Sequence, residues 1–162
     1  MVIITNYQRE IKKIVYLSTL LVYLDSPYPQ AESVRPSPLT DYEIVKYKEE
    51  EQLGEFIKKS EANLCVARLA NVYGGLKNRG VVYYLFKAVL GGGAFTLHGD
   101  GSQVRDYIFI QDVVRLLAKL VQLNQTNKKE IINISTGKGL SILQLIDLVE
   151  GVAGKKIHVN TV

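Results

Sequence analysis

The stretch IVYLSTLLVYL, residues 14–24, decides the fold, because it is a mostly apolar run between Lys12–Lys13 and Asp25–Ser26–Pro27. A run of this kind, bounded by charged and turn-forming residues, predicts a buried strand that ends in a loop. All four prolines fall within residues 25–38, so this segment is expected to cross the surface as a loop. A helix is then predicted from about residue 39 to residue 59.

The same alternation continues along the chain. Residues 62–69 predict a second strand, and residues 81–90 predict a helix that ends at three glycines. Residues 95–97 and 107–109 predict short strands on either side of the turn at 99–101. The rest predicts a helix opened by Asp112, a strand at 130–134, a helix capped by Ser141 and stopped at Gly154, and a last strand within 156–162. This order predicts an α/β fold with parallel strands.

The composition is that of an ordinary globular protein, with 162 residues, 47% hydrophobic and 22% charged. A net charge of +4 is spread along the chain without a basic stripe, so nucleic-acid binding is not expected. No apolar run approaches the roughly 18 residues that span a bilayer, and the start at Met1 does not resemble a signal peptide. With the lone Cys65, these features predict a cytoplasmic protein. The two histidines, His98 and His158, lie in unrelated elements, so no metal site is expected.

A tyrosine followed four positions later by a lysine occurs three times, at 42/46, 73/77 and 83/87. The spacing alone is weak evidence, because about one such pair is expected by chance. Tyr42 and Lys46 differ from the others, because they open a long amphipathic helix after a strand that ends in Ser18–Thr19. The other two pairs lie across a Gly-Gly turn and on an ordinary apolar helix.

Lys46 falls on the apolar face of the predicted helix, within about 40° of Leu53 and Ile57. A lysine there is costly unless it has a function or a partner, and Glu50, one turn on, is a possible ion-pair partner. The functional alternative is proton transfer coupled to hydride transfer, in which a nearby cation favours the phenolate of Tyr42. The pattern alone leaves both readings open.

Five motifs, in order, resemble the extended short-chain dehydrogenase/reductase family, in its branch of NAD-dependent sugar-nucleotide epimerases and dehydratases. They are the strand at 14–23, the Pro-x-x-x-Tyr-x-x-x-Lys-x-x-x-Glu helix ending at 50, Arg-Leu-Ala-Asn-Val-Tyr-Gly at 68–74, Gly-Asp-Gly-Ser-Gln-Val-Arg-Asp-Tyr at 99–107 followed by Gln-Asp at 111–112, and Asn-Ile-Ser-Thr-Gly at 133–137. The resemblance covers nearly the whole chain.

The resemblance implies a role for each matching position. The catalytic residues would be Thr19, Tyr42 and Lys46. The residues contacting NAD or NADP would be Ser18, Tyr42, Lys46, Ala70, Val72 and Tyr73. Asn71 and Arg105 would bind the diphosphate of a nucleotide-diphosphate sugar, and an arginine fork suits phosphate oxygens. The alternative for Arg105 is a local salt bridge to Asp106.

Two departures from the family pattern affect the expected reaction. Family dehydratases carry an acidic pair just after the catalytic threonine, but this chain has Leu20 and Leu21 there. The resemblance therefore favours an epimerase, acting by transient oxidation with a tyrosine base, or a ketoreductase. The glycine-rich cofactor fingerprint is also absent, and its nearest imitation, at 137–139, is better explained as a plain strand–helix turn.

These features together predict a partial Rossmann-like, doubly wound parallel sheet with part of a small substrate-binding subdomain. The chain is expected to be a single truncated domain. Residues 1–75 would hold the later Rossmann strands and the catalytic helix, and residues 76–162 mostly the substrate-binding region with a returning strand–helix unit. Such a chain is expected to self-associate or to pair with a missing N-terminal half. The alternative is a non-catalytic interaction module that keeps the fold without binding a cofactor.

Overall fold

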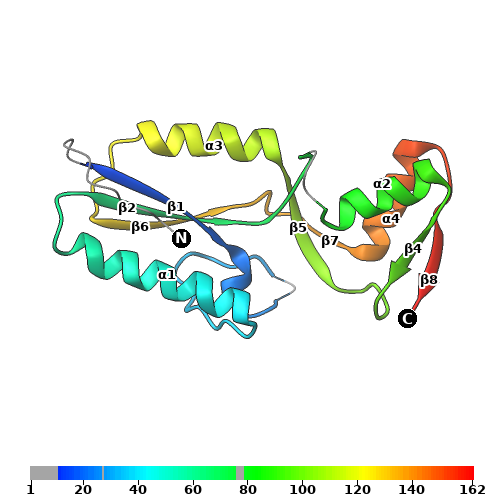
Figure 1. The fold of residues 1–162 in the computed structure, drawn as a ribbon, viewed down its shortest axis with the longest axis horizontal. Coiled ribbons are helices and arrows are strands. Elements are labelled where there is room, and N and C mark those ends of the chain that lie inside the picture. Colours follow the sequence, from blue (N-terminus) through cyan, green and yellow to red (C-terminus); the bar gives the residue numbers. More distant parts are fainter. Residues whose placement is uncertain (1–10, 27, 76–78) are drawn as a thin grey trace.

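The computed structural model describes residues 11–26, 28–75 and 79–162. Strands β1 (Lys13–Thr19), β2 (Asn63–Leu69) and β6 (Lys129–Ile134) form a parallel sheet in the order β1–β2–β6. Helix α1 (Asp41–Ile57) covers one face of this sheet and α3 (Ile110–Gln122) covers the other (Figure 1). Helices on both faces of a parallel sheet make a doubly wound, Rossmann-like arrangement, so the predicted α/β class is confirmed.

Strand β2 shows how the sequence builds this layered core. Successive side chains of a strand point to opposite faces. Leu64 and Val66 accordingly pack on the α1 side, whereas Cys65 and Ala67 pack on the α3 side. Arg68 continues the strand as a fully buried charge, 1% exposed, within an otherwise apolar element.

The strand predicted for residues 14–24 is too long. β1 ends at Thr19, and Leu20–Val22 form the 3-10 turn η1. The Thr19 side chain accepts a hydrogen bond from the Leu21 amide at 3.2 Å, and the Tyr23 amide donates to the Leu20 carbonyl at 3.1 Å. The apolar run is therefore divided by a side-chain cap that hydrophobicity does not reveal.

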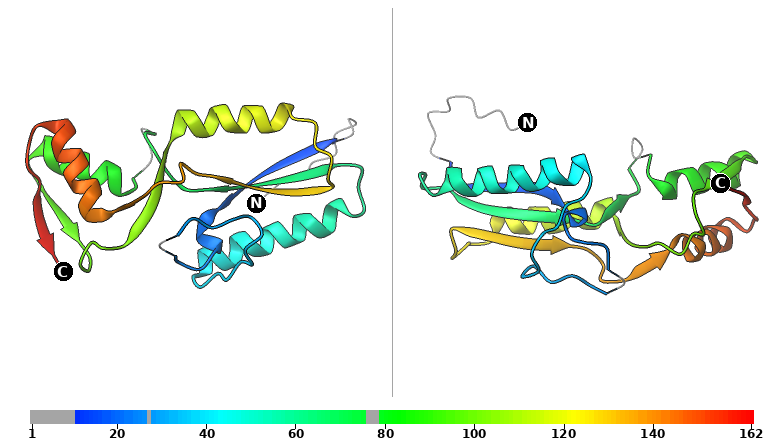
Figure 2. Two further views of the ribbon diagram at one scale, coloured as in Figure 1. Left: turned by 180° about the vertical axis from the view of Figure 1, so that it is seen from behind. Right: turned by 90° about the horizontal axis from the view of Figure 1, so that it is seen from below.

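A second group of elements lies beside this sheet (Figure 2). Helices α2 (Val81–Gly91) and α4 (Ile142–Ala153) pack together next to the parallel pair β4 (Ala94–Leu97) and β8 (His158–Thr161). α4 begins at a capping box made by Ser141 with Gln144 and ends at Gly154, whose φ is +63°. Both ends agree with the prediction, because these residue types satisfy the unpaired groups of helix termini.

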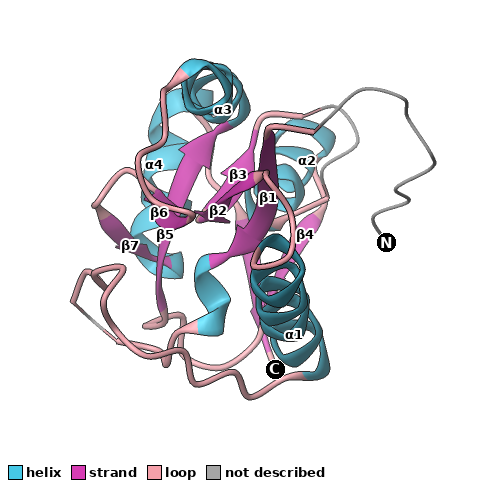
Figure 3. Cartoon of the chain, turned by 90° about the vertical axis from the view of Figure 1, so that its left-hand side faces the viewer, coloured by secondary structure: helices cyan, strands magenta, loops and turns pink. Residues whose placement is uncertain are grey.

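A small sheet lies between the two groups (Figure 1), and the end-on view shows α1 and α3 on opposite sides of the strands (Figure 3). β5 (Val104–Phe109) lies between β3 (Asn71–Tyr73), parallel to it, and β7 (Gly139–Ser141), antiparallel to it. The strands flanking the turn at 99–101 are both present, but each pairs elsewhere. β3 and β7 were not predicted, because three residues are too few to show a period.

No helix in the described part of the chain is both long and apolar enough to cross a membrane.

Of the three tyrosine–lysine pairs, the one at 73/77 includes Lys77, which lies outside the described residues.

Candidate functional site

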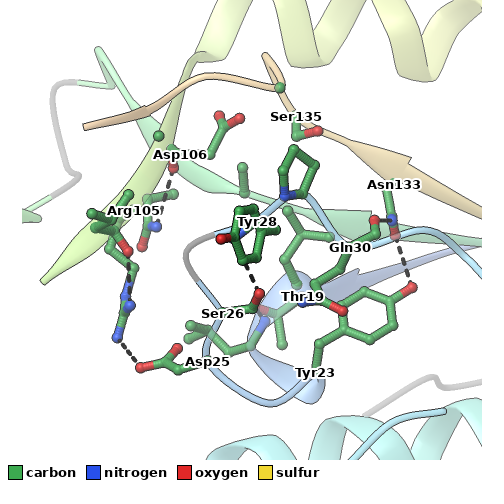
Figure 4. Close-up of a pocket in the computed structure, with 18 of the residues that line it drawn as sticks. Thr19, Tyr23, Asp25, Ser26, Tyr28, Gln30, Arg105, Asp106, Asn133 and Ser135 are labelled. Atoms are coloured by element: carbon green, nitrogen blue, oxygen red, sulfur yellow. Dashed lines mark hydrogen bonds and ion pairs between the residues drawn. The ribbon is translucent and has the colours of Figure 1, made fainter. Parts of the chain in front are cut away.

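A pocket of about 330 Å³ opens at the carboxyl ends of β1 and β2, where they face β5 (Figure 4). In open α/β sheets, ligands bind beyond this end of the strands. Four of the predicted site residues line the pocket: Thr19, Ala70, Asn71 and Arg105. The structure thus brings together residues that are up to 86 positions apart in the sequence (19 to 105).

Thr19 and Ser18 are neighbours in the chain with different surroundings. Thr19 lines the pocket and caps the turn that follows it. Ser18 is buried, and its hydroxyl donates a hydrogen bond to the Glu50 carboxylate of α1. Ser18, predicted to contact the cofactor, is not among the residues that line the pocket.

Tyr42 and Lys46 lie on α1, outside the set of residues that line the pocket. Tyr42, in the first turn, is 57% exposed. The Lys46 ammonium lies 4.3 Å from the centre of the Tyr16 ring and 3.3 Å from Glu49 Oε2. Glu50 was a possible ion-pair partner of Lys46, but Lys46 pairs with Glu49, one residue earlier, and Glu50 pairs with Arg68.

The surroundings of Lys46 keep its partner ionised. The Tyr16 hydroxyl donates to the Glu49 carboxylate, and this bond lowers the pKa of Glu49. Burial, followed by the contact with Glu49, raises the pKa of the Tyr16 phenol far above its ordinary value. Lys46 therefore lies between a neutral aromatic ring and a carboxylate that stays charged at neutral pH.

Arg105 reaches across the mouth of the pocket (Figure 4). Its Nη2 lies 2.9 Å from Asp25 Oδ2, and its Nη1 donates to its neighbour's carbonyl at Val104. The alternative of a local salt bridge to Asp106 is wrong, because Asp106 accepts hydrogen bonds from backbone amides of residues 136 and 138. The Asn71 side-chain amide donates to the Asp106 carbonyl at 3.1 Å, which holds it beside Arg105.

Val72 and Tyr73 line a second cavity, of about 660 Å³, which Asn71 also borders. The short strand β3 therefore forms part of the wall of both cavities. Gly74 follows with a φ of +93°, and a Cβ there would lie 2.2 Å from the Phe109 ring. Glycine is required at this position for its backbone conformation and for space.

The turn at residues 137–139 is already occupied by an anion from the chain itself. The amides of Thr136 and Lys138 point at the Asp106 carboxylate, with N–O distances of 3.0 to 3.2 Å. The next helix, α4, is capped by the Ser141 hydroxyl. Both observations agree with a plain strand–helix turn.

Sequence reasoning missed a buried polar network that adjoins the pocket. Glu50 of α1 pairs with Arg68 of β2, and Arg68 in turn donates to the Tyr23 hydroxyl. Tyr23 and Asn133, which are hydrogen-bonded to one another, both line the pocket. The available signal was Arg68, a charge in an apolar strand that must find a buried partner.

A doubly wound sheet with a polar pocket at the carboxyl ends of its strands is typical of the Rossmann-like nucleotide-binding class. Residues 3–135 match the model of the NAD dependent epimerase/dehydratase family, and the chain belongs to this family.

The relatives are sugar-nucleotide epimerases. The chain is 32% identical to a putative UDP-glucose 4-epimerase of Methanocaldococcus jannaschii, over 92% of this chain and 50% of the relative. Among solved structures, it resembles UDP-glucose 4-epimerase from Thermotoga maritima with UDP-glucose, with a TM-score of 0.81 and 31% identity over 93% of this chain and 50% of the other. It also resembles UDP-glucuronic acid 4-epimerase from Bacillus cereus in complex with UDP-glucuronic acid and NAD, with a TM-score of 0.88 and 26% identity over 96% and 50% of the two chains. The chain spans about half the length of these relatives.

Proposed function

We propose that this chain supplies the substrate-binding and catalytic part of an NAD-dependent epimerase that acts on a nucleotide-diphosphate sugar. The observation that carries the proposal is the convergence of Thr19, Asn71 and Arg105 on one pocket at the carboxyl ends of the strands. The two solved relatives named above, which hold UDP-glucose and UDP-glucuronic acid, support a UDP-sugar as the ligand. The apolar Leu20 and Leu21 favour epimerisation over dehydration, since they offer no acid or base.

The residues present fit one end of the cofactor. Hydroxyl and ammonium groups of Tyr42 and Lys46 suit the hydroxyls of a nicotinamide ribose, and the backbone at 70–73 suits the ring. The pyrophosphate has no corresponding cradle in the described residues, because the turn at 137–139 already holds Asp106. When bound, the cofactor supplies hydride acceptance and return. We therefore propose that its pyrophosphate is held by residues outside the described part of this chain.

In the proposed reaction, Tyr42 accepts the proton of the sugar hydroxyl that is oxidised and returns it afterwards. A phenol is ordinarily protonated at neutral pH, so proton acceptance requires a nearby cation that favours the phenolate. The Lys46 ammonium, one turn away on the same helix, contributes to this by favouring the phenolate. Thr19 orients the sugar hydroxyl by a hydrogen bond.

The sheet also supports a pairing proposal. β1 lies at the edge of the sheet β1–β2–β6, and no described residue pairs with its outer side. Leu17 of this strand is 45% exposed. Because an unpaired apolar edge attracts further strands, we propose that β1 pairs with a separate N-terminal half or with a second copy of the chain.

A non-catalytic binding module is the second candidate, because Tyr42 and Lys46 do not line the pocket that contains Thr19. In that case the pocket would bind a nucleotide diphosphate, and no partner chain would restore turnover. A Tyr42→Phe variant, assayed with the pairing partner present, discriminates the two. The enzyme loses turnover in this variant and keeps UDP binding, whereas the binding module has no turnover to lose.

The test of the proposed site is a calorimetric titration with UDP. We expect Arg105→Ala to weaken binding by about 1.5 to 3 kcal/mol, because a charge-assisted hydrogen bond is removed. The matched control is Arg115→Ala on α3, which removes an exposed arginine that pairs with Asp112 and does not line the pocket. Equal UDP affinity for the unaltered chain and Arg105→Ala would contradict the proposed site.

A further inference from the structure

The ion pair between Glu50 and Arg68 lies beside the pocket and is fully buried, with each residue 1% exposed. Arg68 Nε lies 3.1 Å from Glu50 Oε1, and Nη2 lies 2.6 Å from Oε2, so the contact is bidentate. Burial opposes the charge on Arg68, but its bonds to Glu50 and Tyr23 outweigh burial and raise its pKa. Arg68 therefore stays charged inside the protein.

Replacing such a buried pair with apolar residues of similar volume is often neutral or stabilising in proteins. A contribution to folding stability therefore does not by itself explain why a charged pair is buried at this position. What distinguishes Glu50 and Arg68 is that each side chain forms one further hydrogen bond among the described residues, and both bonds lead toward the pocket.

The contact of Glu50 leads to Thr19. The Glu50 carboxylate accepts a hydrogen bond from Ser18, the residue immediately before Thr19. This bond fixes the end of β1 against α1. It thereby sets the direction in which the next residue enters the pocket.

The contact of Arg68 leads to the opposite wall. Its Nη1 donates to the Tyr23 hydroxyl at 2.6 Å, and that hydroxyl donates to Asn133 Oδ1 at 3.1 Å. The Asn133 side-chain amide donates to the Gln30 carbonyl at 2.8 Å, and its backbone amide donates to Glu32 at 2.9 Å. The loop that carries Gln30 and Glu32 is thus tied to the sheet through hydrogen bonds that begin at Arg68. Figure 4 shows the part of this chain formed by Tyr23, Asn133 and Gln30.

We propose that Glu50 and Arg68 are positioning residues, which hold the end of β1 and the pocket wall formed by Tyr23, Gln30 and Asn133 in one geometry around the ligand. The part of this inference that concerns the ligand rests on the proposed function. The part that concerns the wall does not, because it can be measured in the ligand-free chain.

The test uses Tyr23→Phe, which removes the hydroxyl between Arg68 and Asn133 and keeps the ring that stacks on Arg68 at 4.7 Å. The readout is amide hydrogen exchange by NMR. The Ser37 amide bonds the Val22 carbonyl, and the Asn133 amide bonds Glu32. We expect both amides to exchange about tenfold faster, as one lost hydrogen bond implies. Amides of α4 should be unchanged.

The matched control is Tyr84→Phe, which removes a hydroxyl from α2 at a residue that is 45% exposed and does not line the pocket. It should leave exchange at Ser37 and Asn133 unchanged. If Tyr23→Phe does not fold, Asn133→Leu removes the same hydrogen bond between Tyr23 and Asn133 from the other partner. In that variant, the exchange rate of the Ser37 amide alone tests the proposal. Unchanged exchange at Ser37, or an equal acceleration across α1, α3 and α4, overturns the proposal.

A UDP titration separates this inference from the proposed function. We expect Tyr23→Phe to bind UDP about three- to tenfold more weakly, because the binding free energy must then also order the loosened pocket wall. If Arg105→Ala binds UDP normally, the proposed function fails, and the exchange data still decide the positioning role. If Arg105→Ala weakens binding and Tyr23→Phe leaves both binding and exchange unchanged, the positioning role alone fails.

Discussion

Arg105, which we propose binds the diphosphate, forms an ion pair with Asp25 in this structure. A diphosphate in the pocket would compete with the Asp25 carboxylate for the same guanidinium group. Because the Asp25 side chain is 71% exposed, the ion pair contributes only about 0 to 1 kcal/mol. We expect Asp25→Asn to raise UDP affinity by about two- to fivefold, measured by calorimetry.

The control for this prediction is the same change in an Arg105→Ala background. There the gain should vanish, since nothing remains for Asp25 to compete for. A gain of equal size in both backgrounds would indicate general charge repulsion. A loss of affinity in Asp25→Asn would mean that Asp25 holds Arg105 in its binding position.

At the scale of an element, the start of α1 controls where Tyr42 lies. Thr40 and Glu43 form a capping box, in which the Glu43 carboxylate accepts from the amides of Leu39 and Thr40. These backbone bonds lower the pKa of Glu43 below its ordinary 4.5. A lowered folded-state pKa means that the contribution is fully present above pH 4.5 and is lost as pH falls through the folded value.

We therefore expect the urea concentration at the unfolding midpoint to decrease when the pH is lowered from about 7 to about 3.5. The pKa values of Glu49, Asp100 and Glu150 are lowered as well, so they act in the same direction. In Glu43→Gln, which keeps a capping side chain without the charge, the fall should be smaller. A midpoint equal or higher at the acidic pH would contradict the prediction.

At the scale of the whole molecule, β1 has an edge with which no described residue pairs, and the described residues offer no cradle for a pyrophosphate. We expect residues 1–162 alone to show no NAD binding by calorimetry and to have a mass in light scattering above the 18.1 kDa of one chain. Leu17→Lys should reduce this association by placing a charge at the exposed edge strand. Leu90→Lys, at an exposed position of α2, is the control. Micromolar NAD binding by a monomer would contradict the expectation.

Local patterns were enough to predict most elements of this protein. The helix from Ser141 to Gly154 was predicted at both ends, because capping residues and periodicity act within a few positions of one another. The family was also predictable, because five ordered motifs are a property of the sequence alone. The strand that ends at Thr19 was overestimated, since its cap lies inside an apolar run.

The contacts around the site depended on tertiary structure. Lys46 can reach a carboxylate at either 49 or 50 along its helix, and Tyr16 on β1 decides in favour of Glu49. Glu50 is consequently available to Arg68, 18 residues away, and Arg105 meets Asp25 across 80 residues. A sequence determines which residues need partners by burial and charge. Which partner each receives is decided when strands and loops distant in the chain are packed side by side, because a buried charge takes the nearest satisfying group in space.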